Sequence, residues 1–145
     1  MNSKKLRLFA IALIVAIGIF LWHKDYEYRL AHGQVTAVSL FNWDQEVSQQ
    51  KDTMPVVVYF YHQSGAPDDR ENKAVKNLAW DTAGKVKVVS VDASRPENLV
   101  LAIASGAGRL PSFVILYKDR VIHGQDGTFS DERELKRLIE KAVSP

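Results

Sequence analysis

The chain has 145 residues, of which 46% are hydrophobic and 25% charged, a composition typical of one folded domain with a short extension. It contains no cysteine, which excludes disulfide bonds, thiolate metal sites and cysteine nucleophiles. The net charge is +2 and falls to about −1 without Lys4, Lys5 and Arg7, so no basic surface for nucleic acid is expected.

The first feature along the chain is an apolar run, LFAIALIVAIGIFLW, from Leu8 to Trp22. A membrane-spanning helix usually needs about 20 apolar residues, and about 17 is near the lower limit. Leu6 extends the run, because Arg7 can reach the headgroups with its guanidinium. The predicted organisation is a cytoplasmic N-terminus at residues 1–7, a transmembrane signal anchor at 8–22, a juxtamembrane spacer at 23–37 and a domain at 38–145.

A cleaved signal peptide is the alternative interpretation, but bulky and charged residues follow Trp22 where small residues would mark a cleavage site. The basic residues precede the apolar run, so the positive-inside rule places the N-terminus in the cytoplasm. The domain is then expected on the other side of the inner (plasma) membrane, which is the periplasm in a Gram-negative bacterium. Trp22, Tyr26 and Tyr28 lie where an interfacial aromatic belt is expected.

The domain alternates between helical and strand periodicity, which predicts an α/β fold. Its central strand, Pro55–Tyr61, is apolar on both faces. The patterns predict a helix near residues 40–47, a strand at 55–61 and a helix from about Asp68 to Gly84. A strand at 85–91 follows, and then a short helix that is capped by Ser94 and ended by Gly106. The last elements are strands at 112–117 and 120–123 and a helix capped by Ser130.

Four of these helices have a predicted buried face. In the helix near residues 40–47 it consists of Leu40, Trp43 and Val47, and in the helix from about Asp68 it consists of Val75, Leu78 and Ala79. In the short helix after Ser94, the residues expected to point inward are Leu99, Ala102 and Ile103. In the last helix, they are Leu135, Leu138, Ile139 and Ala142.

This order of elements resembles the thioredoxin family. Leu110-Pro111 stands before the third strand, where the family has a cis-proline, Lys118-Asp119 occupies the turn between the last two strands, and Gly124 matches a family glycine. The resemblance covers about Val38 to Ala142. It implies a thioredoxin-like three-layer sandwich with a central mixed sheet, preceded here by one N-terminal transmembrane helix.

The resemblance fails at the redox site. Aligned from Phe60, the family's Cys-Gly-Pro-Cys falls on Gly65-Ala66-Pro67-Asp68, in a degenerate loop that comprises Ser64, Gly65, Ala66, Pro67 and Asp68. The aspartate that the family often buries in its central strand is replaced by Tyr59. Thiol–disulfide exchange needs an attacking thiolate and a resolving thiol, so classical redox activity is excluded.

Other chemistry is weakly supported. Ser64 with His62 could form a nucleophile and base, although a loop serine beside a strand-end histidine is the more common situation. His62 and His123 could approach each other across the sheet, but the four histidines lack metal-ligand spacing. The acids after Pro67 are expected to complement the helix dipole. We therefore expect no metal and no cofactor.

In the family, the residue before the cis-proline offers its backbone to an extended peptide, a role that the resemblance assigns to Leu110. A peptide-binding groove is expected between residues 63–67, which include Gln63, and the segment Arg109, Leu110, Pro111. The alternative is that Pro111 only shapes the edge of the core.

The expected function is a binding or assembly module, adaptor or chaperone-like, for a protein partner in an envelope complex. A structural accessory subunit of a membrane complex and an enzyme with non-sulfur chemistry in the groove are the alternatives.

Overall fold

The computed structural model describes residues 3–63, 69–123 and 132–145. Its elements are α1 (Ser3–His32), β1 (Thr36–Val38), the short π-helix η1 (Asp44–Ser48), β2 (Val56–Tyr61), α2 (Asp69–Asp81), β3 (Lys87–Asp92), α3 (Pro96–Ala104), β4 (Ser112–Tyr117), β5 (Arg120–His123) and α4 (Glu132–Val143).

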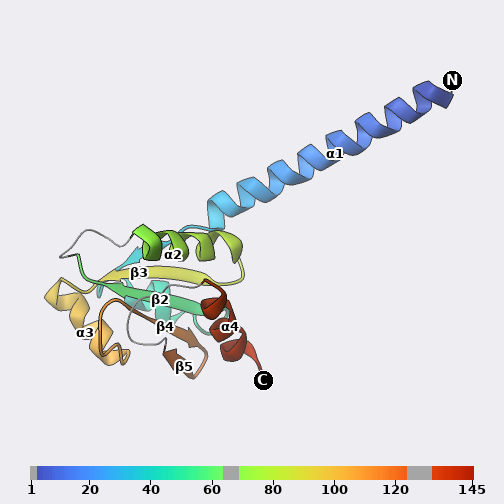
Figure 1. The fold of residues 1–145 in the computed structure, drawn as a ribbon. Helices are drawn as coiled ribbons and strands as arrows, with labels where there is room; N and C mark the ends of the chain where they lie inside the picture. Colours follow the sequence, from blue (N-terminus) through green and yellow to red (C-terminus); the bar gives the residue numbers. More distant parts are fainter. Residues whose placement is uncertain (1–2, 64–68, 124–131) are drawn as a thin grey trace.

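The sheet has the order β1-β3-β2-β4-β5, in which β1, β3 and β2 are parallel and β4 and β5 are antiparallel to their neighbours. β2 is central, and its side chains alternate between two buried clusters, with Val57 and Tyr59 on one face and Val58 and Phe60 on the other. α2 and α4 cover the first face, whereas η1 and α3 cover the second (Figure 1). The predicted three-layer α/β sandwich with a mixed sheet is therefore confirmed.

The elements with a clear apolar pattern in the sequence were predicted correctly. β2 is buried along nearly its whole length, and β4 with β5 forms the expected antiparallel hairpin. On α4, Leu135, Ile139 and Ala142 are buried and Leu138 packs beside them, as predicted. The predicted caps and glycine at Ser130 and Gly124 lie outside the described residues.

The predicted inner face of α3 is only partly right: Ala102 is buried as predicted, but Leu99 and Ile103 are not. Leu99 and Ile103 are 41% and 67% exposed, and the buried residues are Asn98, Leu101 and Ala102. The polar Asn98 turns inward because its amide donates to the carbonyl of Asp92 and its oxygen accepts from the backbone N–H of Leu40, both at 3.0 Å. Two backbone groups that would otherwise lose a partner are thereby satisfied.

Two local predictions near these elements are also corrected. Ser94 does not cap α3, since its hydroxyl donates to the Asp92 carboxylate and Arg95 is the N-cap residue. Of the helical face predicted around residues 40–47, Val47 is fully buried and Trp43 stacks on Phe60, but Leu40 is 45% exposed. The predicted helix is reduced to η1 and Trp43 before it, and residues 40–42 form a turn.

The segment predicted as a spacer is structured. α1 continues through residues 23–32, and Thr36 and Ala37 already belong to β1, which pairs with Val89 and Ser90 of β3. A three-residue strand is too short to produce an alternating pattern, so no periodic signal marks β1 in the sequence. α1 projects from the α2 side of the domain (Figure 1).

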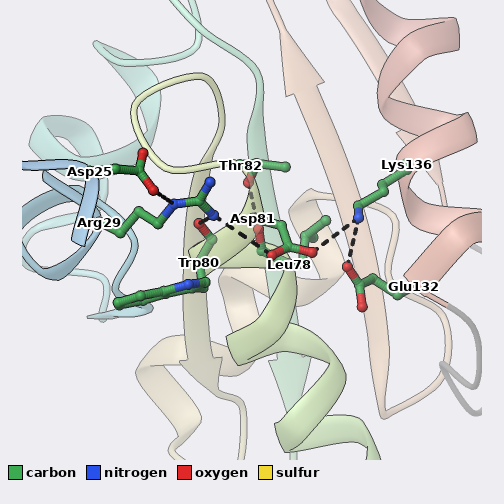
Figure 2. Close-up of polar contacts among 8 residues, drawn as sticks. All are labelled: Asp25, Arg29, Leu78, Trp80, Asp81, Thr82, Glu132 and Lys136. Carbon is green, nitrogen blue, oxygen red and sulfur yellow. Dashed lines mark hydrogen bonds and ion pairs between the residues drawn. The ribbon is translucent and has the colours of Figure 1, made fainter. Parts of the chain in front are cut away.

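A chain of ionic contacts joins three helices (Figure 2). The Arg29 guanidinium of α1 lies 3.9 Å from the Asp81 carboxylate at the end of α2, and Asp81 lies 3.2 Å from the Lys136 ammonium of α4, which also pairs with Glu132. Burial opposes ionisation of Asp81, but its hydrogen bond with Lys136 and the charges of Lys136 and Arg29 outweigh burial and lower the pKa of Asp81 below its ordinary value. The carboxylate is thus the central charge of the chain.

A lowered pKa in the folded state means that Asp81 stabilises the fold above its ordinary value of 3.8 and loses this effect as the pH falls through its folded-state pKa. We expect Asp81→Asn to lower the free energy of unfolding at pH 7, with the difference from the parent shrinking between about pH 5 and pH 2. Urea unfolding of the full chain in mild detergent at several pH values measures this. Asp119→Asn, at the exposed β4–β5 turn, is the control, and an Asp81→Asn difference that stays constant with pH would contradict the assignment.

Asn98→Ala should lower the free energy of unfolding by about 2 kcal/mol, because it removes two hydrogen bonds and leaves buried backbone groups unpaired. Leu99→Ala, at the neighbouring exposed position, should cost well under half of that. Urea denaturation compares the two variants. If Leu99→Ala lowered the free energy of unfolding more than Asn98→Ala, the result would support the inner face predicted from periodicity.

Candidate functional site

The candidate site lies at the carboxyl end of β2. His62 and Gln63 follow this strand and are exposed, and α2 begins at Asp69 on the far side of the connecting loop. The five residues of the degenerate loop, Ser64, Gly65, Ala66, Pro67 and Asp68, lie outside the described residues, so the predicted pairing of Ser64 with His62 is not tested. What the structure does define is the frame that holds both ends of this loop.

The segment Arg109 to Pro111 reaches the same end of the sheet. The Leu110-Pro111 peptide bond is cis, as the resemblance predicted, and β4 begins directly after it. Ser112 pairs with Phe60 in the antiparallel register, which places Pro111 beside the end of β2. The structure therefore brings residue 63 and residues 109–111, the two predicted walls of the groove, to the same end of the sheet.

The two sides of this segment differ in character. Leu110 is half-buried and packs on the core cluster beneath α3, whereas Arg109 is exposed. The segment thus offers an anchored backbone and an outward cation at one place. Such an arrangement suits recognition of an extended chain by main-chain contacts.

The end of β2 holds two stacked tyrosines. Tyr59, at the position of the family's aspartate, is 5% exposed, and its ring lies 5.8 Å from that of Tyr61, with an interplanar angle of 16°. Burial first, and then the negative charge of Asp92, raise the pKa of the Tyr61 phenol above its ordinary value of 10.0, with Arg95 opposing them. Tyr61 therefore stays protonated at neutral pH and cannot serve there as a base.

The predicted approach of His62 and His123 is not found. β4 lies between β2 and β5, and His123 pairs with Val114, which in turn pairs with Val58. His62 is four residues further along the chain than Val58, so the two histidines are separated across the sheet and along it. Within residues 3–63, 69–123 and 132–145, no group of three or more His, Asp or Glu residues is arranged to hold a metal ion.

Sequence reasoning missed Ser112, the first residue of β4. It is 3% exposed, and its hydroxyl has no hydrogen-bond partner among the described residues. A buried hydroxyl without a partner costs about 1–3 kcal/mol. A strand position gives no sequence signal for this, because serine is common at strand ends for reasons of turn chemistry.

Sequence reasoning also missed an apolar surface on the α3 side. Phe41 is 88% exposed, and α3 exposes Leu99, Val100 and Ile103. Beside it, a groove of about 470 Å³ lies between α3 and β5 and includes Trp43, Leu101, Gly106, Val121 and His123 in its lining.

Replacing Ser112 by Ala should raise the free energy of unfolding by about 1 kcal/mol, since the buried hydroxyl has no partner among the described residues and loses its water on folding. Thr82→Val is the matched control of opposite sign, because the Thr82 hydroxyl donates to the Leu78 carbonyl at 2.6 Å. Urea unfolding of both variants measures the two changes. Destabilisation by Ser112→Ala would mean that the hydroxyl has a partner after all.

No family model matches the chain, and no curated protein matches it in sequence. Solved structures do match. Thioredoxin f from spinach chloroplast aligns in its long form with a TM-score of 0.66 at 24% identity, over 82% of this chain and 94% of that one. Its short form aligns with a TM-score of 0.64 at 26% identity, over 78% and 96% of the two chains. A mutant thioredoxin from Halobacterium salinarum has a TM-score of 0.62 at 25% identity, over 78% and 94%.

Proposed function

Because the chain has a thioredoxin-like fold without a single cysteine, we propose that it is a membrane-anchored, redox-inactive binding module that helps assemble a protein partner into an envelope complex. In this proposal α1 is a single-pass anchor with its N-terminus in the cytoplasm, and the domain lies on the opposite side of the inner membrane. The partner is a protein, recognised at the carboxyl end of β2.

Loss of redox chemistry is supported by the whole site and not only by the missing sulfur. Thiol–disulfide exchange needs a cysteine thiolate to attack a disulfide, and this chain contains no cysteine. The proton relay is also absent, because the aspartate position holds Tyr59 and its neighbour Tyr61 is kept neutral. A domain that has the fold but lacks both the thiols and the buried aspartate is suited to recognition of a partner.

The observation that carries the proposal is the position of Leu110-Pro111. The segment is anchored by Leu110, stands directly before β4 and lies beside the end of β2. Main-chain recognition at this point requires no sulfur. The exposed apolar residues of α3 would extend the contact area on the same side of the sheet as the core cluster that holds Leu110.

The anchor is supported by length and exposure. Residues Lys5–His32 form a helix with a mean hydropathy of 2.2 in its most apolar window, and none of that window is buried against the domain. Side chains such as Leu8, Ile14 and Phe20 are 59–69% exposed all around the helix. In water this surface would be costly, whereas a bilayer would cover it.

Site-specific photo-crosslinking in intact membranes tests the proposal. A photoreactive residue placed at Arg109 or at Gln63 should yield the same adduct of defined mass, because both positions flank the groove. Arg137, 72% exposed on the outer face of α4, is the matched control and should yield none. The adduct should persist when residues 8–22 of α1 are replaced by an unrelated membrane span and residues 23–32 are kept.

Three outcomes would count against the proposal. Equal yields at Arg137 and Arg109 would remove the specificity of the groove. Loss of the adduct only after the span is exchanged would favour a structural accessory subunit that acts through its helix. Reduction of insulin by the purified chain above a buffer blank would contradict the redox-inactive assignment.

A further inference from the structure

The end of α1 packs against the end of α2 at two glycines. The Gly33 N–H donates to the Arg29 carbonyl at 2.7 Å, and a Cβ at Gly33 would lie 3.0 Å from the Trp80 Cα. At Gly84, where φ is +73°, a Cβ would overlap the Tyr28 hydroxyl oxygen. Gly33 thus lets the backbone of α2 approach, and Gly84 leaves room for the Tyr28 side chain, in each case closer than a residue with a Cβ permits.

Aromatic side chains continue this contact along α1. Tyr26 stacks on Trp22 and meets Trp80 of α2 edge to face, with ring centroids 5.7 Å apart in both pairs. Tyr28 stacks on His32 beside Gly84. Tyr26 and Tyr28, expected from the sequence to sit at the membrane interface, therefore contact the domain.

Polar contacts hold the same two helix ends. Arg29 donates to the Trp80 carbonyl at 3.2 Å and pairs with Asp25 at 2.9 Å, and through Asp81 it connects to Lys136 of α4 (Figure 2). The Arg29 side chain is 32% exposed, so this is a partly buried contact. The hydrogen bond to the Trp80 carbonyl is therefore the partly buried contact, whereas the carboxylates of Asp25 and Asp81 are 58% and 45% exposed and their ion pairs contribute less.

The segment itself has the chemistry of a stiff helix. Residues 23–32 contain no glycine, proline or serine, the residues that make linkers flexible. His23 with Glu27 and Asp25 with Arg29 are spaced i, i+4, which supports helix formation. Ten residues of helix extend about 15 Å beyond the predicted span at residues 8–22.

We propose that residues 23–33 are a rigid post, which fixes the orientation of the domain relative to its membrane helix. The post holds the α2–β3 turn, which includes Gly84, toward the bilayer and directs α3 to the far side, away from it (Figure 1). A partner would then meet the α3 side of the domain at one set angle and height. The direction relative to lipid rests on the membrane anchoring proposed above, whereas the rigidity of the post does not.

The absence of native cysteine allows a direct test, since two introduced cysteines are the only labelling sites. Spin labels at Gly18→Cys in α1 and Val100→Cys in α3 report the distance between helix and domain by pulsed electron resonance. We expect one narrow distance distribution, the same in detergent micelles and in lipid nanodiscs. A broad distribution in the parent chain would overturn the proposal.

Variants separate the post from general stability. Gly33→Leu and Trp80→Ala should broaden the distribution at least twofold, and Arg137→Ala, which removes a charge on α4 paired only within that helix in the described structure, should leave it unchanged. Two independent variants are needed in case one fails to fold, which the unfolding transition reports. Unchanged widths in both folded variants would contradict the proposal.

A third label position tests the orientation. Relaxation by nickel chelated to lipid headgroups should be stronger for a label at Lys85, next to the α2–β3 turn, than for one at Val100. A reversed order with a narrow distance distribution would contradict the predicted direction while leaving the rigid post intact. If only the crosslinking experiment failed, the result would contradict the proposed function and leave the rigid post intact.

Discussion

The fold depends on the burial of β2 on every side. The strand is hydrogen-bonded to β3 and β4 along both edges, and its side chains enter both core clusters. A strand of this kind is stable only when helices cover both faces of the sheet, so the layers formed by α2 with α4 and by η1 with α3 are required by its sequence. The end of β2 and the start of β4 are thereby brought to the same end of the sheet.

The backbone frame of the candidate site does not depend on the residues that would carry redox chemistry. The frame of the proposed groove, built by the end of β2 and the start of β4, is made of backbone pairing and core contacts that do not depend on a cysteine pair. What has changed are the groups that would react, which are replaced by a loop without sulfur and by two stacked aromatic rings. The backbone frame is thus that of a thioredoxin-like fold without the sulfur chemistry.

The parts of the fold that could be predicted are those whose burial follows a simple period. β2 and α4 are apolar at every position that points inward, so their pattern identifies them directly. α3 could not be predicted in the same way, because its inner face includes Asn98, which is held by backbone partners outside its own helix. Periodicity counts apolar residues and has no means to detect such a polar anchor.

At the candidate site, the Leu110-Pro111 segment was predicted from the resemblance, and its placement beside β2 followed from strand order. Ser112 could not be predicted, since the burial of its hydroxyl without a partner in the described part of the chain is a property of the packed neighbourhood. The docking of α1 on α2 was missed for a related reason. A glycine that permits close approach is indistinguishable in sequence from one that ends a helix, and Gly33 does both.

The short strand β1 has a practical consequence for any soluble fragment of this protein. Cutting the chain at residue 38, where the pattern of the sequence suggests that the domain starts, would remove Thr36 and Ala37 and leave the outer edge of β3 without its hydrogen-bonding neighbour. It would also uncover the indole of Trp80. An open strand edge beside an uncovered aromatic ring invites self-association, so a fragment that retains residues 23–37 is the sound choice for solution work.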